Sequence, residues 1–257
     1  ETASWKSLPD AILLAWQAGQ EGGNTVADIL RGKVNPSGKL PMTFPLKAND
    51  AASARNFPDA DSVDPKEMMG SFMGGKDQPS NRPNIDYTNY EEGIYVGYRY
   101  FDSFNKAVSY PFGYGESYTT FNYAGLKVEP QSNGYRVRCV ITNHGDVAGK
   151  EVVQLYIAAP GKQLDKPAKE LRGFAKTALL QPGKSEEVIF TFTDADLASF
   201  DEIASQWVTE AGRYEVLIGS SAADIRLRGD FERSQQTVIE KVHAVLTPQQ
   251  HINVLKP

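Results

Sequence analysis

The sequence predicts an α+β fold in which an incomplete α/β segment is followed by an antiparallel β-sandwich. Two patterns of hydrophobic residues predict this class. Near the N-terminus, an apolar run of strand length leads through a glycine-rich turn into residues with helical spacing, whereas after residue 119 the apolar residues recur at every second position. The 257 residues, 40% of them hydrophobic, can hold one large or two ordinary domains with buried cores.

The beginning of the chain predicts one half of a βα unit. Asp10–Trp16 is a continuous apolar run, which is typical of a parallel strand covered on both faces. A turn at Gly19–Gly23 follows, and Asn24 is placed to cap a short helix that ends at Gly32. Lys39–Phe44 is expected to form a short extended piece.

The next stretch, residues 46–118, predicts a long loop followed by an aromatic connector. Lys47–Asn84 shows no sustained period, so it predicts an excursion over the surface or over a neighbouring domain. Gly93–Phe101 has the composition of a strand, and Tyr110–Gly115 is a turn rich in aromatic rings.

Alternating runs then predict seven or eight short strands over residues 119–232. The runs are Phe121–Val128, Tyr135–Thr142, Glu151–Ala158, Lys169–Ala175, Glu186–Thr193, Gln206–Glu210, Gly212–Gly219 and Ile225–Phe231. Their number and spacing indicate a two-sheet sandwich of immunoglobulin type. Because the cysteine and tryptophan signature of antibody domains is absent, the fibronectin-like variant fits better. The single cysteine, Cys139, is expected to be a small buried residue.

Charge and residue spacing exclude several classes of function. The net charge is −5 and the charges are interspersed, so we expect no nucleic-acid partner. No apolar run approaches the roughly 20 residues of a membrane span. The three histidines, His144, His243 and His251, are scattered and lack ligand spacing, so no metal site is expected, and His144 is assigned to its turn.

Several long stretches of the sequence follow one ordered pattern: Ala15–Gly23, Val26–Gly32, Asn35–Pro45, Tyr90–Phe101, Pro111–Tyr118, Thr142–Ile157 and Lys169–Phe174. The first three resemble the end of the α/β-sandwich domain in glycoside hydrolase family 3, of the β-glucosidase type. The next two are similar to the segments that join this domain to the C-terminal module of the family. The last two resemble the fibronectin type III-like module itself, so the resemblance extends to about residue 232.

The resemblance implies a division of the chain and a parent enzyme. Residues 1–45 would be the C-terminal part of the α/β-sandwich domain, 46–118 the loop and connector, 119–232 the fibronectin type III-like domain and 233–257 a tail. The parent would be a retaining β-glucosidase that hydrolyses terminal non-reducing β-D-glucosyl residues with two carboxyl groups. β-Xylosidase and β-N-acetylglucosaminidase are alternative substrate classes. The family is commonly periplasmic or secreted, and the resemblance implies no cofactor.

The resemblance also places both catalytic carboxyl groups outside this chain. The nucleophilic Asp would lie in a TIM-barrel-like first domain, and the acid/base Glu would lie upstream of Glu1. The chain begins without methionine, which suggests a cut within a larger protein whose barrel domain would be the partner. We therefore assign no catalytic, cofactor-binding or metal residue, and we expect the chain alone to be structural and inactive.

Four features carry a second interpretation. Glu21 lies where a site forms in α/β sheets, but a structural role beside the glycines is favoured because a helix N-terminus stabilises the ionised form. Glu91 and Glu92 are adjacent and would point to opposite faces of a strand, so one is expected to pair with Arg99. The loop Lys47–Asn84 is a candidate to shape the outer subsites of the parent's pocket.

The aromatic residues of the connector predict either a buried interdomain joint, which we favour, or a sugar-stacking platform. They are Tyr95, Tyr98, Tyr100, Phe101, Tyr110, Phe112, Tyr114 and Tyr118. A carbohydrate-binding module is one competing function, and it would need an exposed row of rings on one sheet, for which the sequence offers Tyr135, Tyr156 and Trp207. An adhesion or spacer module is the other, and it explains the sandwich but not Ala15–Pro45.

Overall fold

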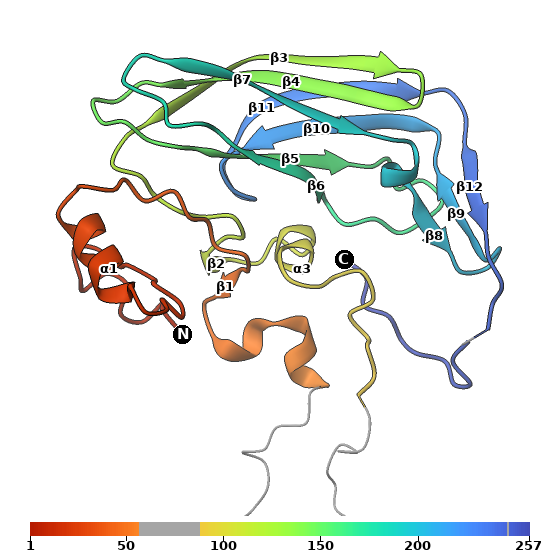
Figure 1. Ribbon diagram of the computed structural model, residues 1–257. Helices are drawn as coiled ribbons and strands as arrows, with labels where there is room; N and C mark the ends of the chain where they lie inside the picture. The colour runs from red at the N-terminus through yellow and green to blue at the C-terminus, as the bar shows by residue number, and fades with distance from the viewer. Residues whose placement is uncertain (57–87, 246) are drawn as a thin grey trace, which may run out of the picture.

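The computed structural model describes residues 1–56, 88–245 and 247–257 (Figure 1). Its centre is a sandwich of two antiparallel sheets, as the alternating runs predict. One sheet has the order β3 (Phe121–Gln131), β4 (Gly134–Asn143), β7 (Ser185–Phe192). The other has the order β11 (Ile225–Arg233), β10 (Gly212–Gly219), β5 (Val152–Ala158), β6 (Glu170–Lys176).

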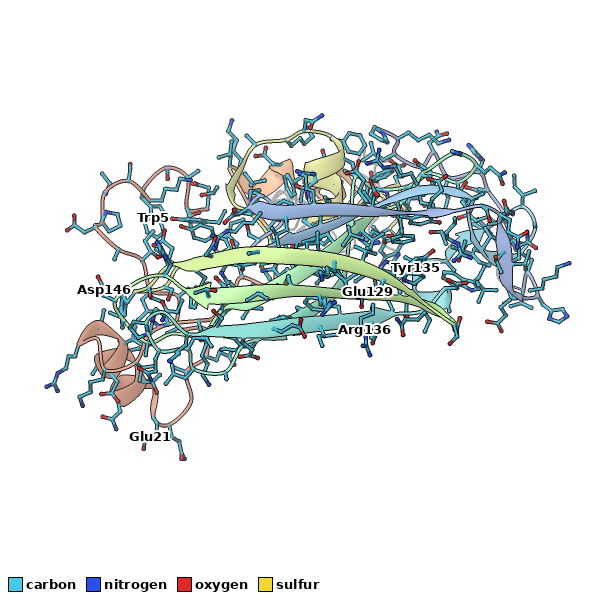
Figure 2. All side chains as sticks on the ribbon, turned by 90° about the horizontal axis from the view of Figure 1, so that it is seen from above. Trp5, Glu21, Glu129, Tyr135, Arg136 and Asp146 are labelled. Atoms are coloured by element: carbon cyan, nitrogen blue, oxygen red, sulfur yellow. The ribbon has the colours of Figure 1, made fainter. Side chains whose placement is uncertain are left out.

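The main core lies between the two sheets and is built from the inward-facing residues of each strand. In β4, Val137, Cys139 and Ile141 are 0% exposed, and Val216 and Ile218 face them from β10. The outer face of the β3-β4-β7 sheet carries charged residues such as Glu129 and Arg136, which Figure 2 shows from above. Cys139 is buried as predicted, and burial raises the pKa of its thiol to about 11.

A third, smaller sheet extends the sandwich at one end. It has the order β12 (Thr237–Lys241), β9 (Gln206–Thr209), β8 (Ser199–Asp201). The sequence patterns predict neither β8 nor β12. The predicted tail therefore begins with a strand, because the backbone of Thr237–Lys241 pairs with β9. Leu246 lies outside the described residues.

The N-terminal residues lie beside the sandwich and contain one helix. The helix α1 spans Gly22–Leu30, so Glu21 rather than Asn24 occupies its N-cap, and Gly32 ends it with φ +71° as predicted. Asp10–Trp16 forms no strand, because a parallel strand needs hydrogen-bonded neighbours and none pairs with it here. The expected extended piece Lys39–Phe44 is shorter than predicted: β1 (Phe44–Pro45) pairs with β2 (Val108–Tyr110).

The connector also differs from its predicted structure. Gly93–Phe101 is not a strand: it is a turn followed by the helix α3 (Tyr98–Ser103). The helix places Tyr98 toward the sandwich, while Tyr100 and Phe101 are buried in a separate cluster. Tertiary packing therefore overrides the strand composition of this segment.

Two short 3-10 helices, η1 (Ala48–Asp50) and η2 (Ala52–Arg55), occupy the described beginning of the predicted loop. The rest of the predicted loop, from residue 57, and its hypothetical role at a pocket lie outside the described residues. Within residues 1–56, 88–245 and 247–257, no helix has the length and hydropathy that a membrane crossing needs.

Candidate functional site

The connector packs on the outer face of the β11-β10-β5-β6 sheet and forms a third layer. Figure 1 shows α3 and β2 below this sheet, on the side away from β3 and β4. Tyr156 and Leu217, on neighbouring strands, are 0% and 4% exposed on this outer face, where Tyr98 and Phe112 pack against them. β5 and the second half of β10 are thus buried on both faces, which explains why burial does not alternate along them.

Aromatic contacts and one hydrogen bond attach α3 to the sheet. The Tyr98 ring stacks on Phe112 at 4.8 Å between centroids and meets Tyr156 edge to face at 5.9 Å. The Tyr98 hydroxyl accepts a hydrogen bond from the backbone N–H of Leu171 at 2.7 Å. Leu171 lies on the edge strand β6, so the helix covers an edge that could otherwise pair with another strand.

Ion pairs continue this contact along β6. Asp102 accepts from Lys169 at 2.6 Å, and Arg99 lies 3.4 Å from Glu170. The prediction that Arg99 pairs with Glu91 or Glu92 is therefore wrong, because α3 directs its side chain toward the sandwich. Helical geometry separates Arg99 from the two preceding glutamates, which lie in a turn.

The loop between β5 and β6 is held by two buried residues. The Tyr95 hydroxyl, on a side chain that is 0% exposed, donates to Asp165 at 2.6 Å. The Glu210 carboxylate accepts from the backbone N–H of Gln163 at 2.6 Å and lies 3.9 Å from the Lys166 ammonium. Burial lowers the pKa of Lys166, while the charge of Glu210 opposes that shift.

A glutamine joins the turn after β2 to two strands of the sheet. The Gln154 amide donates to the carbonyl oxygens of Gly113 at 3.1 Å and Ser220 at 2.7 Å, and its oxygen accepts from the Tyr156 hydroxyl at 2.6 Å. Gly113 has φ +78°, and a Cβ there would lie 2.1 Å from the Gln154 oxygen. Only glycine fits this position without displacing the glutamine.

The N-terminal segment is attached to the sandwich separately. The Lys39 ammonium lies 3.1 Å from Glu151 and donates to the carbonyl of Gly115 at 3.0 Å. The Asn35 amide donates to Ala148 at 3.1 Å, and its oxygen accepts from the backbone N–H of Tyr118 at 2.8 Å. The first 46 residues are therefore joined to the module by charge and hydrogen bonds as well as by chain connectivity.

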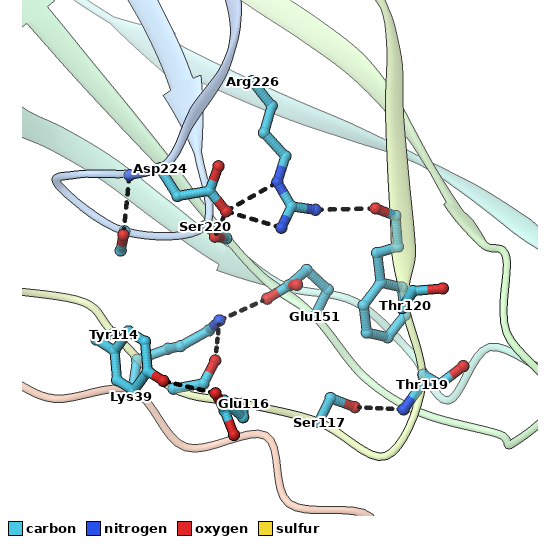
Figure 3. A pocket seen from close by; sticks show the side chains of 13 residues that line it. Lys39, Tyr114, Glu116, Ser117, Thr119, Thr120, Glu151, Ser220, Asp224 and Arg226 are labelled. Carbon is cyan, nitrogen blue, oxygen red and sulfur yellow. Dashed lines mark hydrogen bonds and ion pairs between the residues drawn. The ribbon is translucent and has the colours of Figure 1, made fainter. Parts of the chain in front are cut away.

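A polar cavity of about 560 Å³ lies at this joint (Figure 3). Four of its charged groups form two ion pairs: Lys39 with Glu151, and Arg226 with Asp224 at 2.8 Å. Hydrogen bonds from Arg226 lower the pKa of Asp224 below its ordinary value. The Tyr114 hydroxyl donates to Glu116 at 2.6 Å, and burial with this bond raises the Tyr114 pKa to about 12. The arrangement holds two segments together and offers no acid and base pair directed at an open space.

The three glutamates that the sequence analysis weighed as carboxylates of a site, Glu21, Glu91 and Glu92, do not form one. Glu21 is exposed at the start of α1, near the edge of the molecule in Figure 2, and its carboxylate accepts from the Asn24 side chain at 2.6 Å rather than from the glycine turn. Glu92 is 6% exposed while its neighbour Glu91 is half-buried. The structure does not bring Glu21 together with either residue in one pocket that it describes.

The aromatic residues of the connector, apart from Tyr118, are buried or half-buried within this chain, and the predicted joint with a further domain stays a prediction. Tyr95, Tyr100 and Phe101 are 8% exposed or less, and Tyr118 is the most exposed of the predicted set at 47%. No planar row of rings stands on the described sheets: Tyr156 is buried, Tyr135 packs on Phe231, and Trp207 is 41% exposed beside Phe200 with the rings tilted by 55°. The structure therefore gives little support to a carbohydrate-binding surface of stacked rings.

His144 lies in the turn after β4, where its backbone N–H donates to Thr120 at 2.8 Å. Among the described residues, no group of three or more histidine, cysteine, aspartate or glutamate side chains has the arrangement of a metal site.

A conservative change at Tyr98 tests the joint. Replacing Tyr98 by Phe keeps the ring stacking but leaves the buried N–H of Leu171 without its acceptor, so we expect the free energy of unfolding to fall by about 1–2 kcal/mol. Urea denaturation followed by circular dichroism measures the loss. Tyr90→Phe is the control, because Tyr90 is 78% exposed and the same change there should have little effect. Equal losses in the two variants would contradict the assigned bond.

Sequence and structure comparisons identify relatives of both parts of the chain. Residues 1–98 match the glycosyl hydrolase family 3 C-terminal domain, and residues 151–222 match the fibronectin type III-like domain. The chain is 40% identical over 261 residues to beta-glucosidase A of Butyrivibrio fibrisolvens, covering 93% of this chain and 29% of that protein. It is 43% identical over 225 residues to beta-glucosidase B of Emericella nidulans, covering 86% of this chain and 25% of that protein.

A solved structure also aligns with most of this chain. Beta-glucosidase 3B from Thermotoga neapolitana, in complex with α-D-glucose, aligns with a TM-score of 0.78 and 46% identity over 92% of this chain. This chain covers 30% of the Thermotoga protein. It thus spans less than a third of the length of each of these three relatives.

Proposed function

Because this chain carries the C-terminal domain of glycosyl hydrolase family 3 and a fibronectin type III-like domain, it belongs to that family, and we propose that it is the structural C-terminal part of a retaining β-glucosidase. The named relatives support this proposal, since beta-glucosidases A and B match 93% and 86% of the chain. Terminal non-reducing β-D-glucosyl residues are the proposed substrate, and β-xylosides and β-N-acetylglucosaminides are the alternatives.

The observation that carries the structural role is an apolar surface on the N-terminal segment. Leu8 is 81% exposed, Trp16 56% and Leu30 69%, and Ile12, Leu13 and Leu14 are each 40% exposed or more. Clustered exposed hydrophobic residues mark a surface that another protein region covers. We propose that the remaining part of the α/β domain and a barrel domain cover it, with Asp10–Trp16 then pairing as a strand.

The chemistry of retaining glycosidases supports placing catalysis elsewhere in the parent. Such enzymes use two carboxyl groups about 5–5.5 Å apart, one to attack the anomeric carbon and one to protonate the leaving oxygen. Glu21 is exposed and bonded to Asn24, and Glu91 and Glu92 lie in a turn of the connector. In the proposed division, residues 1–45, 46–118 and 119–232 position the catalytic domains, and the parent is periplasmic or extracellular.

A test of the proposal uses the full-length protein from the same coding sequence. We expect it to release glucose from aryl β-D-glucosides, with proton NMR showing the β-anomer as the first product. The same assay with aryl β-xylosides and β-N-acetylglucosaminides decides the substrate class. An upstream sequence that encodes an unrelated domain, or a first product with inverted configuration, would contradict the proposal.

A substitution on the apolar surface should reduce self-association of the chain alone but destabilise the full-length parent protein. Leu14→Lys removes exposed apolar area from the chain alone, so we expect less self-association in analytical ultracentrifugation and an unchanged thermal midpoint. In the full-length protein the introduced ammonium group would be buried without a partner, so we expect the free energy of unfolding to fall by several kcal/mol. Ile203→Lys is the matched control, because Ile203 is 99% exposed in the turn between β8 and β9. Equal effects of Leu14→Lys in both contexts would show that nothing covers this surface.

A further inference from the structure

The last residues of the chain return from the outer end of the sandwich to the connector. Figure 1 shows the C-terminus beside α3, although β12, which precedes it, lies at the far end of the molecule. The backbone N–H of Leu255 donates to the carbonyl of Glu91 at 2.6 Å. The half-buried Leu255 side chain packs against a small cluster formed by Ala52, Tyr95, Tyr100 and Phe101.

A glycine in the connector allows the tail to approach closely. Gly93 has φ +54°, and a Cβ on it would lie 2.5 Å from Cγ1 of Val254. Real Cβ atoms do not approach that closely, so any side chain at position 93 would displace the tail or strain the turn. The site therefore combines a backbone hydrogen bond, an apolar anchor and a close approach at a glycine.

The tail also contacts two segments that are distant in sequence. Ala52 belongs to η2, whereas Tyr95 belongs to the connector, and both lie in the cluster on which Leu255 packs. A hydrogen bond of 3.4 Å from the Asn56 amide to the Asn89 carbonyl joins the same two segments. The tail thus contacts a cluster to which both residues 52–56 and residues 89–95 contribute.

We propose that residues 252–257 act as a C-terminal clasp, an intramolecular peptide ligand for the surface formed by the turn at Glu91–Tyr95 and the Ala52 cluster. The clasp ties the end of the chain, beyond the fibronectin type III-like match, to the family 3 C-terminal domain match. Few contacts suffice, because a tethered ligand binds at a high effective concentration. The inference stands on the contacts alone and does not depend on which sugar the parent hydrolyses.

Hydrogen exchange of the full chain tests the clasp. We expect Leu255→Asp to raise exchange rates of the amides in residues 95–104 by fivefold or more, while the amides of β4 and β10 keep their protection. Val245→Asp is the matched control, because Val245 lies in the same tail and is 79% exposed. Equal exchange in the two variants, or loss of protection in β4 and β10 with Leu255→Asp, would overturn the proposal.

A second measurement supplies the clasp as a separate peptide. In a chain lacking residues 252–257, a synthetic peptide of residues 247–257 at millimolar concentration should restore the protection of residues 95–104, and a peptide with Leu255→Asp should not. The chain with residues 252–257 present should show no change with either peptide, because its own tail already occupies this surface. Failure of the unmodified peptide to restore protection, or equal effects of both peptides, would show that the tail is not a specific ligand of the connector.

Discussion

Replacing Gly113 by Ala is expected to lower the free energy of unfolding by about 3 kcal/mol, since it combines a strained backbone with a clash in a buried network. The new Cβ would lie 2.1 Å from the Gln154 side-chain oxygen. That glutamine cannot move away freely, because it bonds the carbonyl oxygens of Gly113 and Ser220 and the Tyr156 hydroxyl. Guanidinium denaturation followed by circular dichroism measures the effect.

Gly183 provides the matched control for this substitution. It has φ +74°, close to that of Gly113, but no atom lies within 4 Å of its built Cβ. Gly183→Ala therefore carries the backbone strain without the clash, and we expect a loss of about 1 kcal/mol. Equal losses at the two positions would mean that the contact between the connector and Gln154 does not contribute to stability.

Replacing Lys39 by Met is expected to cost about 3 kcal/mol, because it leaves a buried carboxylate without its partner. The side chains of Lys39 and Glu151 are 13% and 7% exposed, and their charged atoms are 3.1 Å apart. The loss should appear in the same denaturation experiment. Lys33→Met is the control, because Lys33 and Asp28 form an exposed pair with 57% and 41% side-chain exposure, and such pairs contribute little.

A double variant separates the cost of the unpaired charge from general damage. Adding Glu151→Gln to Lys39→Met removes the carboxylate, so we expect it to recover at least half of the stability that Lys39→Met loses. If the loss of stability in the double variant equals the sum of the losses in Lys39→Met and Glu151→Gln alone, the pair does not hold the N-terminal segment against the sandwich.

The sandwich could be predicted from the sequence because each of its strands carries its own signal. β4 and β7 alternate between buried and exposed residues, and antiparallel pairing with one solvated face produces that period. β5 departs from it: Gln154 and Tyr156 point outward yet are 3% and 0% exposed. What covers them is the connector, which precedes them in the chain, and no local pattern in β5 encodes that contact.

In the N-terminal segment and in α3, the sequence did not predict the secondary structure, for two other reasons. The apolar run at Asp10–Trp16 has strand composition and is exposed here, because hydrogen-bonded neighbours decide whether such a run becomes a strand. Tyr98–Ser103 has the aromatic composition of a strand and forms a helix, because Tyr98 packs on the sheet while Tyr100 and Phe101 fill another cluster. Composition is a weak guide where tertiary contacts on both sides compete.

Much of the candidate site could not be predicted for the same reason. The density of aromatic residues in the connector indicated a buried region, and the structure buries or half-buries all of the predicted set except Tyr118. Its polar partners, such as Lys39 with Glu151 and Asn35 with Ala148, are more than 100 residues apart in the sequence and follow no spacing rule. Their pairing depends on how the segments fold over the sheet, which only the three-dimensional arrangement reveals.

The central claim is that this chain supplies a structural joint rather than the carboxyl groups of a glycosidase. Its most direct test is the release of nitrophenol from an aryl β-D-glucoside by the purified chain alone. We predict a rate equal to that of buffer, both for the unmodified chain and for Glu21→Gln. Release that exceeds the buffer rate and disappears in the Glu21→Gln variant would contradict the account.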